Sequence, residues 1–337
     1  MAASVKWILQ SDIMTKAIVI RAYGGPEALQ IENVAVGEPG PGELRVRQTA
    51  IGVNFHDCYV RSGLYKTLVL PGIPGIEGAG VVEAVGPGVT GFAPGDRVGY
   101  VTASYGSYAE TRLLPAARAV KLPDGMTEDT AAAVFVKGLT AAFLVLRTHR
   151  ILPGQTILVH AAAGAVGQLL CQWASHLGAT VIGTAGSSGK AALARKCGCA
   201  HTILYREEDF LSRTKEITGG RGVDVAYDSV GRDTFSGSLA ALAPRGHLIN
   251  FGQSSGPVAP FSVSDLSARS NSLTRPILFH YITTRAEFEE LVGELFAALS
   301  SGILRVGEPR RFALAEAADA HRAIEARATS SSVLLIP

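Results

Sequence analysis

The stretch Ile157-Leu-Val-His-Ala-Ala-Ala-Gly-Ala-Val-Gly167 runs from an apolar strand pattern through a glycine turn into a helical pattern. Against G-x-G-x-x-G it keeps the second and third glycines and has Ala162 in place of the first. The second glycine would let the backbone approach a pyrophosphate, and the third would let helix and strand pack closely. The helix start would offer free N–H groups. We expect a dinucleotide to contact Gly164, Ala165, Val166 and Gly167, although close packing alone would also favour these glycines.

Strand and helix patterns alternate on both sides of this turn. The expected strands cover residues 155–161, 180–183, 202–205, 223–228 and 246–251. The expected helices cover residues 164–177, 190–196, 208–218 and 234–242. Alternation at these lengths predicts an α/β domain with a doubly wound parallel sheet, the Rossmann arrangement.

The end of the second strand indicates which dinucleotide is bound. An NAD site usually has Asp or Glu about 20 residues after the glycine turn, to bind the ribose 2′-hydroxyl. Here the sequence is VIGTAGSSGK (181–190), which has no carboxylate and ends in a lysine. Gly186 and Ser187 could hydrogen-bond a 2′-phosphate and Lys190 could neutralise it, which predicts NADP(H). The alternative is that Lys190 is a solvated residue at a helix start.

Residues 14–136 have an all-β pattern of short Val/Ile-rich runs, at 16–21, 43–51, 78–85 and 96–100, separated by Gly/Pro turns. Such spacing favours a compact barrel-like domain. From residue 127 an Ala/Leu-rich helical pattern follows. We expect the first part of the β domain at 14–136, the Rossmann domain at 137–275 and a return to the β domain at 276–337. Residues 1–13 are expected to be a poorly ordered extension.

Composition excludes several classes of protein. The 337 residues include 31 basic and 29 acidic side chains, for a net charge of +2, without a run of like charges. Nothing therefore indicates nucleic acid or a membrane surface as a partner, and we expect no apolar stretch long enough to span a bilayer. The cysteines form no metal-binding spacing and are expected to be ordinary thiols in a reducing cytosol. They are Cys58, Cys171, Cys197 and Cys199.

Residues 14–337 resemble the quinone oxidoreductases of the medium-chain dehydrogenase/reductase superfamily. The resemblance rests on VNFHD (53–57), GLY (63–65), GIEGAG (75–80), GDRV (95–98), KGLTA (137–141) and AAAGAVG (161–167). YREED (205–209), YDSVGRD (227–233) and YITTR (281–285) resemble bacterial NADPH:quinone reductases especially closely. The resemblance implies a GroES-like β-barrel catalytic domain interrupted by the Rossmann domain, and a cytoplasmic homodimer.

Zinc-dependent relatives in this superfamily have a Cys where this chain has Asn54 and a His where it has Ile76, and their third ligand aligns near Val136. Isoleucine and valine cannot bind a metal, so we expect no catalytic zinc, and the four-cysteine structural zinc lobe is also missing. Without a Lewis acid, alcohol oxidation is disfavoured. Reduction of a quinone or a conjugated carbonyl compound needs mainly positioning of the hydride donor.

By the same resemblance, Asn54, Asp57 and Tyr59 border the nicotinamide and the substrate. Asn54 could donate to a carbonyl oxygen or only stabilise a turn, and Asp57 could equally be structural. Tyr65 matches a tyrosine proposed as proton donor in enoyl reductases, although an aromatic lining is the favoured interpretation. Thr140 could contact the nicotinamide, next to Lys137 at the domain junction.

A structural role is expected for Glu77. The remaining cofactor contacts implied by the resemblance are Lys190, Tyr205, Ser229, Gly252, Gln253, Ser254 and Arg327, the last of which could instead form a surface ion pair.

Three functions stay open from the sequence. The leading hypothesis is an NADPH:quinone oxidoreductase. The second is an NADPH-dependent reductase of α,β-unsaturated carbonyl compounds, with Tyr65 as proton donor. The third is non-catalytic, because crystallin-like relatives bind NADPH and some bind AU-rich RNA, which the near-neutral charge disfavours. The apolar segment 273–282 is where such enzymes can pair sheet edges across a two-fold axis.

Overall fold

The computed structural model describes residues 13–327 and 329–337, which form two compact units. The first unit comprises Met1–Val136 and Gly307–Pro337, and the second comprises Lys137–Val306. The expected domain ranges were 14–136, 137–275 and 276–337; residues 276–306 belong to the second unit, and the chain returns to the first unit at Gly307. Apart from Ile13, the expected N-terminal extension lies outside the described residues.

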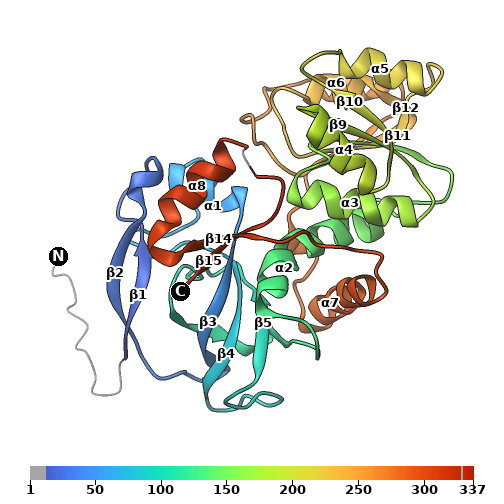
Figure 1. Cartoon of the computed structure of the whole chain (residues 1–337). Coiled ribbons are helices and arrows are strands. Elements are labelled where there is room, and N and C mark those ends of the chain that lie inside the picture. The colour runs from blue at the N-terminus through green and yellow to red at the C-terminus, as the bar shows by residue number, and fades with distance from the viewer. Residues whose placement is uncertain (1–12, 328) are drawn as a thin grey trace. The chain divides into compact units, whose positions relative to one another are not determined.

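The second unit contains a six-stranded parallel sheet in the order β10-β9-β8-β11-β12-β13 (Figure 1). Its strands are β8 (Thr156–Val159), β9 (Thr180–Ala185), β10 (Cys199–Leu204), β11 (Val223–Asp228), β12 (Leu242–Asn250) and β13 (Ser272–Thr274). Chain order reverses between β8 and β11, which is the switch point of a Rossmann sheet. Ligands of such sheets bind beyond the carboxyl ends of the strands at this point.

Five helices belong wholly to the second unit, among the residues described: α3 (Ala165–His176), α4 (Ser188–Lys196), α5 (Phe210–Ile217), α6 (Phe235–Ala240) and α7 (Arg285–Ser300). Side-chain caps define several of their starts. Ser187 accepts a hydrogen bond from the Lys190 amide, and Asp209 accepts one from the Ser212 amide. The helices predicted between residues 164 and 242 are all present, within two residues of the expected ends.

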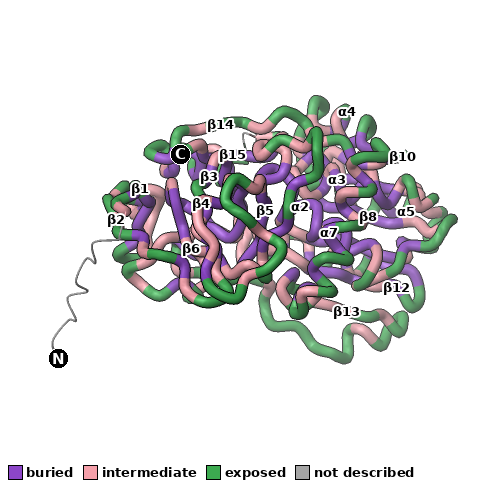
Figure 2. The backbone as a smooth tube through the Cα atoms, turned by 90° about the horizontal axis from the view of Figure 1, so that it is seen from below, coloured by how far each residue is buried: buried purple, intermediate pink, exposed green. Residues whose placement is uncertain are grey.

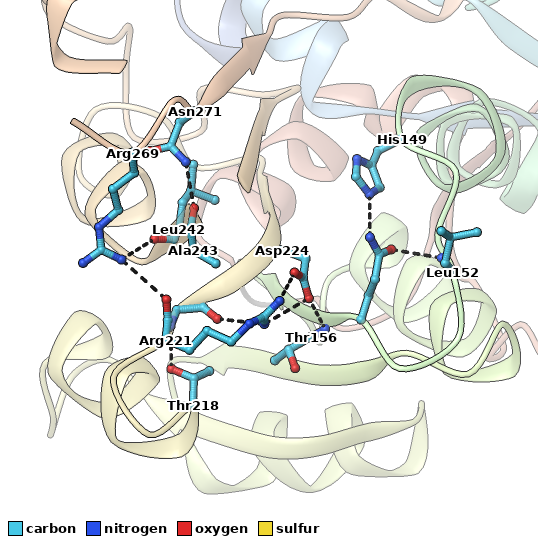
Figure 3. Close-up of polar contacts among 12 residues, drawn as sticks. His149, Leu152, Thr156, Thr218, Arg221, Asp224, Leu242, Ala243, Arg269 and Asn271 are labelled. Atoms are coloured by element: carbon cyan, nitrogen blue, oxygen red, sulfur yellow. Dashed lines mark hydrogen bonds and ion pairs between the residues drawn. The ribbon is translucent and has the colours of Figure 1, made fainter. Parts of the chain in front are cut away.

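Polar side chains tie the amino-terminal edge of this sheet together (Figure 3). The Asp224 carboxylate accepts a hydrogen bond of 2.8 Å from the Thr156 amide, which joins β11 to β8, and it pairs with Arg221. Arg269 donates to the Leu242 carbonyl at 3.0 Å, and Asn271 donates to the carbonyl of Ala243 at 2.9 Å. These contacts stabilise the amino-terminal ends of the strands, whereas ligands of such sheets bind at the carboxyl ends.

The first unit contains a seven-stranded sheet in the order β14-β15-β3-β4-β5-β7, with β6 also paired to β3. A separate hairpin pairs β1 with β2. The strands are β1 (Ile13–Val19), β2 (Gln30–Val36), β3 (Glu43–Val53), β4 (Glu77–Val85), β5 (Arg97–Val101), β6 (Thr111–Pro115), β7 (Ala119–Lys121), β14 (Arg310–Ala313) and β15 (Val333–Ile336). β15 pairs antiparallel with β3, so the end of the chain completes the sheet that its beginning starts.

Two helices accompany this sheet: α1 (Phe55–Ser62) and α8 (Ala317–Glu325). The all-β expectation for residues 14–136 was wrong at α1. This helix is short, and its buried side chains include Asp57 and Arg61, so it lacks the apolar stripe by which helices are found in a sequence. α1 and α8 contribute to one apolar core with β3 and β15. Helix α1 directly follows β3; among the expected catalytic residues, Asn54 caps this helix and Tyr59 lies on it.

Helix α2 (Glu128–Phe143) continues into a π-helical turn, η3 (Leu144–Thr148). Together they are long and apolar enough to cross a membrane by length and composition, which corrects the expectation that no stretch is. However, 72% of the apolar window is buried in the protein, as in a core helix. Strands β3, β5 and β8 also consist largely of buried residues, shown in purple in Figure 2. Residues 256–271, before β13, are largely exposed.

Candidate functional site

The glycine turn after β8 is as tight as the sequence pattern predicts. Ala161 adopts a left-handed conformation with φ of 52°, and its carbonyl accepts a 2.8 Å hydrogen bond from the Gly164 amide. A Cβ atom at Gly167 would lie 2.3 Å from the Ala161 oxygen, and one at Gly164 would lie 3.1 Å from it. Helix α3 then begins at Ala165, and the amides of its first turn have no intrahelical acceptor. This cradle of backbone N–H groups fits the pyrophosphate of a dinucleotide.

The end of β9 lies beside the residue that follows β10. A Cβ atom at Gly186 would lie 2.6 Å from the hydroxyl of Tyr205, and the Tyr205 amide bonds the Ala185 carbonyl at 3.2 Å. Ser187 and Lys190 start α4 next to this contact. The structure thus brings together Gly186, Ser187, Lys190 and Tyr205, as expected, and residues 185–190 contain no carboxylate. A hydroxyl, a phenol and an ammonium group suit a phosphate better than a ribose hydroxyl.

The loops after β11 and β12 lie side by side. The Ser254 amide donates to the Ser229 carbonyl at 3.2 Å, and a Cβ at Gly252 would lie 2.6 Å from the same oxygen. The four expected contact residues at these loops, Ser229, Gly252, Gln253 and Ser254, are therefore brought together at the carboxyl edge of the sheet.

Two residues that order these loops were missed. The buried Asp228 carboxylate accepts from the Val230 and Gly231 amides, at 2.8 and 2.9 Å, and Arg275 donates to the Gly252 carbonyl at 2.9 Å. An Asx-turn pattern, Asp-Ser-Val-Gly, could have identified Asp228.

A buried histidine lies beneath the switch point. His160 Nε2 is 2.9 Å from the Ser238 hydroxyl, which donates to Asp228 at 3.2 Å, and its Nδ1 is 3.2 Å from the Thr184 hydroxyl. Burial lowers the pKa of His160, so the imidazole is neutral at physiological pH. This chain of hydrogen bonds connects β8, β9 and β11 below the loops that would hold the cofactor.

In the first unit, Asn54 lies between β3 and α1 and is buried. Its amide nitrogen donates to Glu77 at 2.8 Å, and the other Glu77 oxygen accepts from the Val136 amide at 2.7 Å. Because a carboxylate only accepts hydrogen bonds, Glu77 fixes which end of the Asn54 amide faces it. A structural role was expected for Glu77, and in the structure Glu77 orients the side chain of Asn54.

Asp57 is fully buried, inside a polar network that joins α1 to α8. Its carboxylate accepts from the Asn54 backbone N–H at 2.8 Å and from the Tyr108 hydroxyl at 3.1 Å. Tyr108 lies 3.0 Å from His321 Nε2, and His321 Nδ1 lies 3.2 Å from the Arg61 guanidinium, which pairs with Glu325. Burial, with a smaller contribution from the Arg61 charge, lowers the pKa of His321 to about 3. This placement favours the structural alternative for Asp57 over a direct cofactor contact.

Tyr59 and Tyr65, both expected near the acceptor, belong to an aromatic cluster with two residues that were not predicted, His56 and Tyr105. Their ring centroids are 5.1 Å apart, and the Tyr65 ring lies 5.6 Å from that of His56. The His56 ring stacks on Tyr105 at 5.9 Å, and its Nε2 is 3.1 Å from the Tyr105 hydroxyl. Burial lowers the pKa of His56 to about 4, so this imidazole is neutral at physiological pH. We call His56, Tyr59, Tyr65 and Tyr105 the aromatic cluster.

The remaining expected residues fall in different units. Thr140 is half-buried on the part of α2 that belongs to the second unit, as is the buried Lys137. Arg327 belongs to the first unit, where it follows α8, is exposed and has a left-handed φ of 54°.

The positions expected to lack zinc ligands contain Asn54 and Ile76, and the Ile76 side chain is buried and has no donor atom. Across residues 13–327 and 329–337, no group of three or more His, Cys, Asp or Glu side chains could hold a metal ion. All four cysteines are free thiols, and the Cys171 and Cys199 sulfurs lie 3.4 Å apart.

Comparison with known proteins defines the class to which these two units belong. Residues 40–124 match the alcohol dehydrogenase GroES-like domain, and residues 165–297 match the zinc-binding dehydrogenase domain. A GroES-like unit interrupted by a Rossmann unit is the architecture of the medium-chain dehydrogenase/reductases, and the chain is an oxidoreductase of that superfamily.

Individual relatives match almost end to end. The quinone oxidoreductase of Pseudomonas aeruginosa is 48% identical, over 96% of this chain and 100% of its own. A 2-haloacrylate reductase of a Burkholderia species is 46% identical, over 96% and 99%. The crystal structure of Escherichia coli quinone oxidoreductase complexed with NADPH is 45% identical and covers 96% of this chain and 100% of that one, with a TM-score of 0.93. The chain belongs to the quinone oxidoreductase family.

Proposed function

We propose that this protein reduces quinones with NADPH and without a catalytic metal. The observation that carries the proposal is the chemistry at two positions. Ser187 and Lys190 after β9, with Tyr205 after β10 beside them, stand where an NAD site would have a carboxylate. The Asn54–Glu77 pair and Ile76 stand where an alcohol dehydrogenase would bind zinc. The full-length similarity to quinone oxidoreductases supports the same conclusion.

The cofactor would be held mainly by backbone. The amides at the start of α3 would bind the pyrophosphate, and the loops at Ser229 and 252–254 would line the path to the nicotinamide. Lys190, Ser187 and Tyr205, all in the second unit, would bind the 2′-phosphate. Bound NADPH would supply the hydride, so no protein side chain needs to carry electrons.

On the acceptor side, Asn54 would position the carbonyl oxygen that gains charge. An amide nitrogen has two N–H bonds, so Asn54 can bind Glu77 and still donate to an acceptor. A neutral donor polarises a carbonyl only modestly, which suits an electron-poor quinone better than a simple ketone. Tyr59 and Tyr65 would pack against the planar ring of the acceptor, and Thr140 would contact the nicotinamide.

A second candidate is reduction of α,β-unsaturated carbonyl compounds. The similarity to a 2-haloacrylate reductase, at 46% identity as high as that to bacterial quinone oxidoreductases, supports it. Both reactions deliver hydride to a conjugated acceptor. The alkene reaction also needs a proton at carbon, which water supplies slowly, so it makes a stronger demand on a positioned acid.

Steady-state rates would test the assignment. We expect NADPH oxidation with 1,4-benzoquinone and 9,10-phenanthrenequinone, and a kcat/KM at least tenfold lower with NADH. The same assay with a 2-alkenal and with 2-chloroacrylate decides on the second candidate. An absence of activity with all four acceptors would contradict the proposal, and AU-rich RNA binding that weakens with salt would then favour a non-catalytic function.

We also propose a cytoplasmic homodimer. β13 is the last strand of its sheet and pairs with β12 on one side, which leaves an edge to which a second copy could add. Light scattering after gel filtration would give about twice the mass of the chain, and a monomer at micromolar concentration would contradict the dimer.

A further inference from the structure

Tyr105 lies in a strained loop between β5 and β6. Its φ is 43°, in the left-handed region that bulky residues rarely adopt, and Gly106 follows with a φ of 99°. Strain of this kind persists only where the surroundings enforce it, and it is concentrated at functional sites. The conformation of Tyr105 is therefore one that its neighbours must hold in place.

A buried arginine holds the backbone of this loop. Arg112 on β6 donates to the Tyr105 carbonyl at 2.7 Å and to the Ser107 hydroxyl at 3.0 Å. Its guanidinium carbon lies 5.1 Å from the centre of the Tyr100 ring, in a cation–π contact. Since Arg112 is itself buried, both contacts are shielded from water, and the loop conformation is fixed rather than incidental.

The side chain of Tyr105 is held at its other end by two protic groups. The hydroxyl lies 2.5 Å from the Thr67 hydroxyl and 3.1 Å from His56 Nε2. Thr67 is exposed, whereas His56 is half-buried and neutral. The phenol is thus connected through Thr67 to solvent, from which a lost proton can be replaced, and is held on the other side by an imidazole.

The same ring belongs to the aromatic cluster, so it is continuous with two residues of the proposed acceptor site. His56 touches Tyr65, and Tyr65 touches Tyr59. His56 is on α1, two residues after Asn54, which caps that helix. All of these contacts lie within the first unit. Burial raises the pKa of Tyr105, so the phenol keeps its proton at neutral pH.

We propose that Tyr105 is the general acid that protonates the reduced acceptor, and that His56 and Thr67 are its positioning residues. The inference rests on the proposed function and applies to conjugated acceptors that need a proton on carbon. Hydride addition to the β-carbon of an α,β-unsaturated carbonyl compound breaks the C=C π bond and leaves an enolate. The Tyr105 O–H bond then breaks, its proton forms a bond to the α-carbon, and the phenolate regains a proton through Thr67 from water. The sum is addition of one hydride and one proton to the alkene.

Substitution of the phenol tests the inference, with a matched control in the same unit. Tyr105→Phe keeps the ring that stacks on His56 and removes only the hydroxyl. Tyr23→Phe is the control, because the Tyr23 hydroxyl donates to the Leu68 carbonyl at 3.2 Å, outside the aromatic cluster. Acceptors are 2-chloroacrylate, which becomes chiral at the protonated carbon, and 9,10-phenanthrenequinone, whose reduced form is protonated on oxygen by water.

We expect Tyr105→Phe to lower kcat for 2-chloroacrylate about 100-fold, the usual contribution of a general acid. The 2-chloropropionate formed should change from one enantiomer to a mixture, because water would then protonate either face. The kcat for the quinone and the Kd for NADPH should change less than threefold. A purely structural loss would lower both activities together, and Thr67→Val should lower kcat for the alkene with an unchanged KM.

Three results would overturn the inference. These are an unchanged alkene kcat in Tyr105→Phe, an unchanged enantiomeric purity of the product, or a wild-type protein that reduces the quinone but neither 2-chloroacrylate nor a 2-alkenal. The last result would leave the quinone reductase proposal intact. A wild-type protein inactive with every acceptor would instead contradict the proposed function itself.

Discussion

Each unit has a buried aspartate that orders the residues proposed to bind the cofactor or the acceptor. The two aspartates differ in how far along the sequence their hydrogen-bonded networks extend. In the second unit, Asp228 bonds Val230, Gly231, Thr234 and Ser238, all within ten residues of it. In the first unit, Asp57 bonds Asn54 nearby, but its chain continues to Tyr108 and on to His321, more than 200 residues from Tyr108 along the sequence.

This difference determines what each region can do without the rest of its fold. The carboxylate that orders the loop after β11 is bonded by neighbours in sequence, and the other contacts of the cofactor loops come from within the second unit. The acceptor side is ordered by side chains from α1, the loop before β6 and α8, and it forms only when the C-terminal segment has returned to the first unit. Substitutions should therefore separate cofactor binding from acceptor turnover.

The largest effect is expected at the glycine turn. Gly167→Ala would place a Cβ atom 2.3 Å from a backbone oxygen, which no side-chain rotation can relieve. The turn must open, and we expect the Kd for NADPH to rise about 100-fold, equivalent to an overpacking cost of about 3 kcal/mol. Isothermal titration would measure it. Gly293→Ala, on an open face of α7, is the control, and near-wild-type binding by Gly167→Ala would show that the turn does not hold the cofactor.

The two aspartates give the next prediction. Asp228→Asn and Asp57→Asn each remove a buried charge that accepts several hydrogen bonds, and each should lower the free energy of unfolding by about 2 kcal/mol. Their functional effects should differ. Asp228→Asn should weaken NADPH binding, whereas Asp57→Asn should lower kcat and leave the Kd for NADPH unchanged.

Chemical denaturation and fluorescence titration would measure these effects, with the exposed Asp265→Asn as control. Equal loss of NADPH affinity in both variants would contradict the separation of the two regions.

A buried histidine in the first unit and a half-buried one in the second make both units sensitive to acid. Burial lowers the folded-state pKa of His321 in the first unit to about 3 and that of His247 in the second to about 4. The unfolded chain takes up these protons near pH 6.5, so stability falls as pH decreases below that value.

Between about pH 5.5 and 4.5, His321→Asn and His247→Asn should each reduce the pH slope of the unfolding free energy, by about 1.4 kcal/mol per pH unit at most. Urea unfolding at several pH values would show it. A wild-type slope in either variant would mean that the histidine in question is protonated in the folded protein.

The smallest effect is expected at the proposed 2′-phosphate site. Lys190→Ala should raise the Kd for NADPH about tenfold and leave that for NADH unchanged, since only NADPH carries the extra phosphate. Lys196→Ala, at the opposite end of α4, controls for net charge. An equal loss of affinity for both cofactors would show that Lys190 does not select NADPH.

The sequence predicted the second unit well because its signals are local. The strand patterns, the glycine turn and the caps of α4 and α5 are each contained in a few consecutive residues. It predicted less of the first unit. Helix α1 buries Asp57 and Arg61, whose partners Tyr108 and His321 lie in the loop before β6 and on α8. Because these buried residues are charged, the sequence of α1 shows no regular apolar spacing. Tyr105 could not be identified, because its strain and its contact with His56 exist only in three dimensions.

The central claim is that NADPH alone supplies the reducing equivalents and that no metal takes part. The most direct test compares initial rates with 9,10-phenanthrenequinone before and after exhaustive dialysis against a chelator, with metal content measured in both samples. The account predicts an unchanged rate with NADPH at less than about one metal ion per ten chains, and a kcat/KM with NADH at least tenfold lower. A rate that is lost on chelation and restored by Zn²⁺, or an equal rate with NADH, would contradict it.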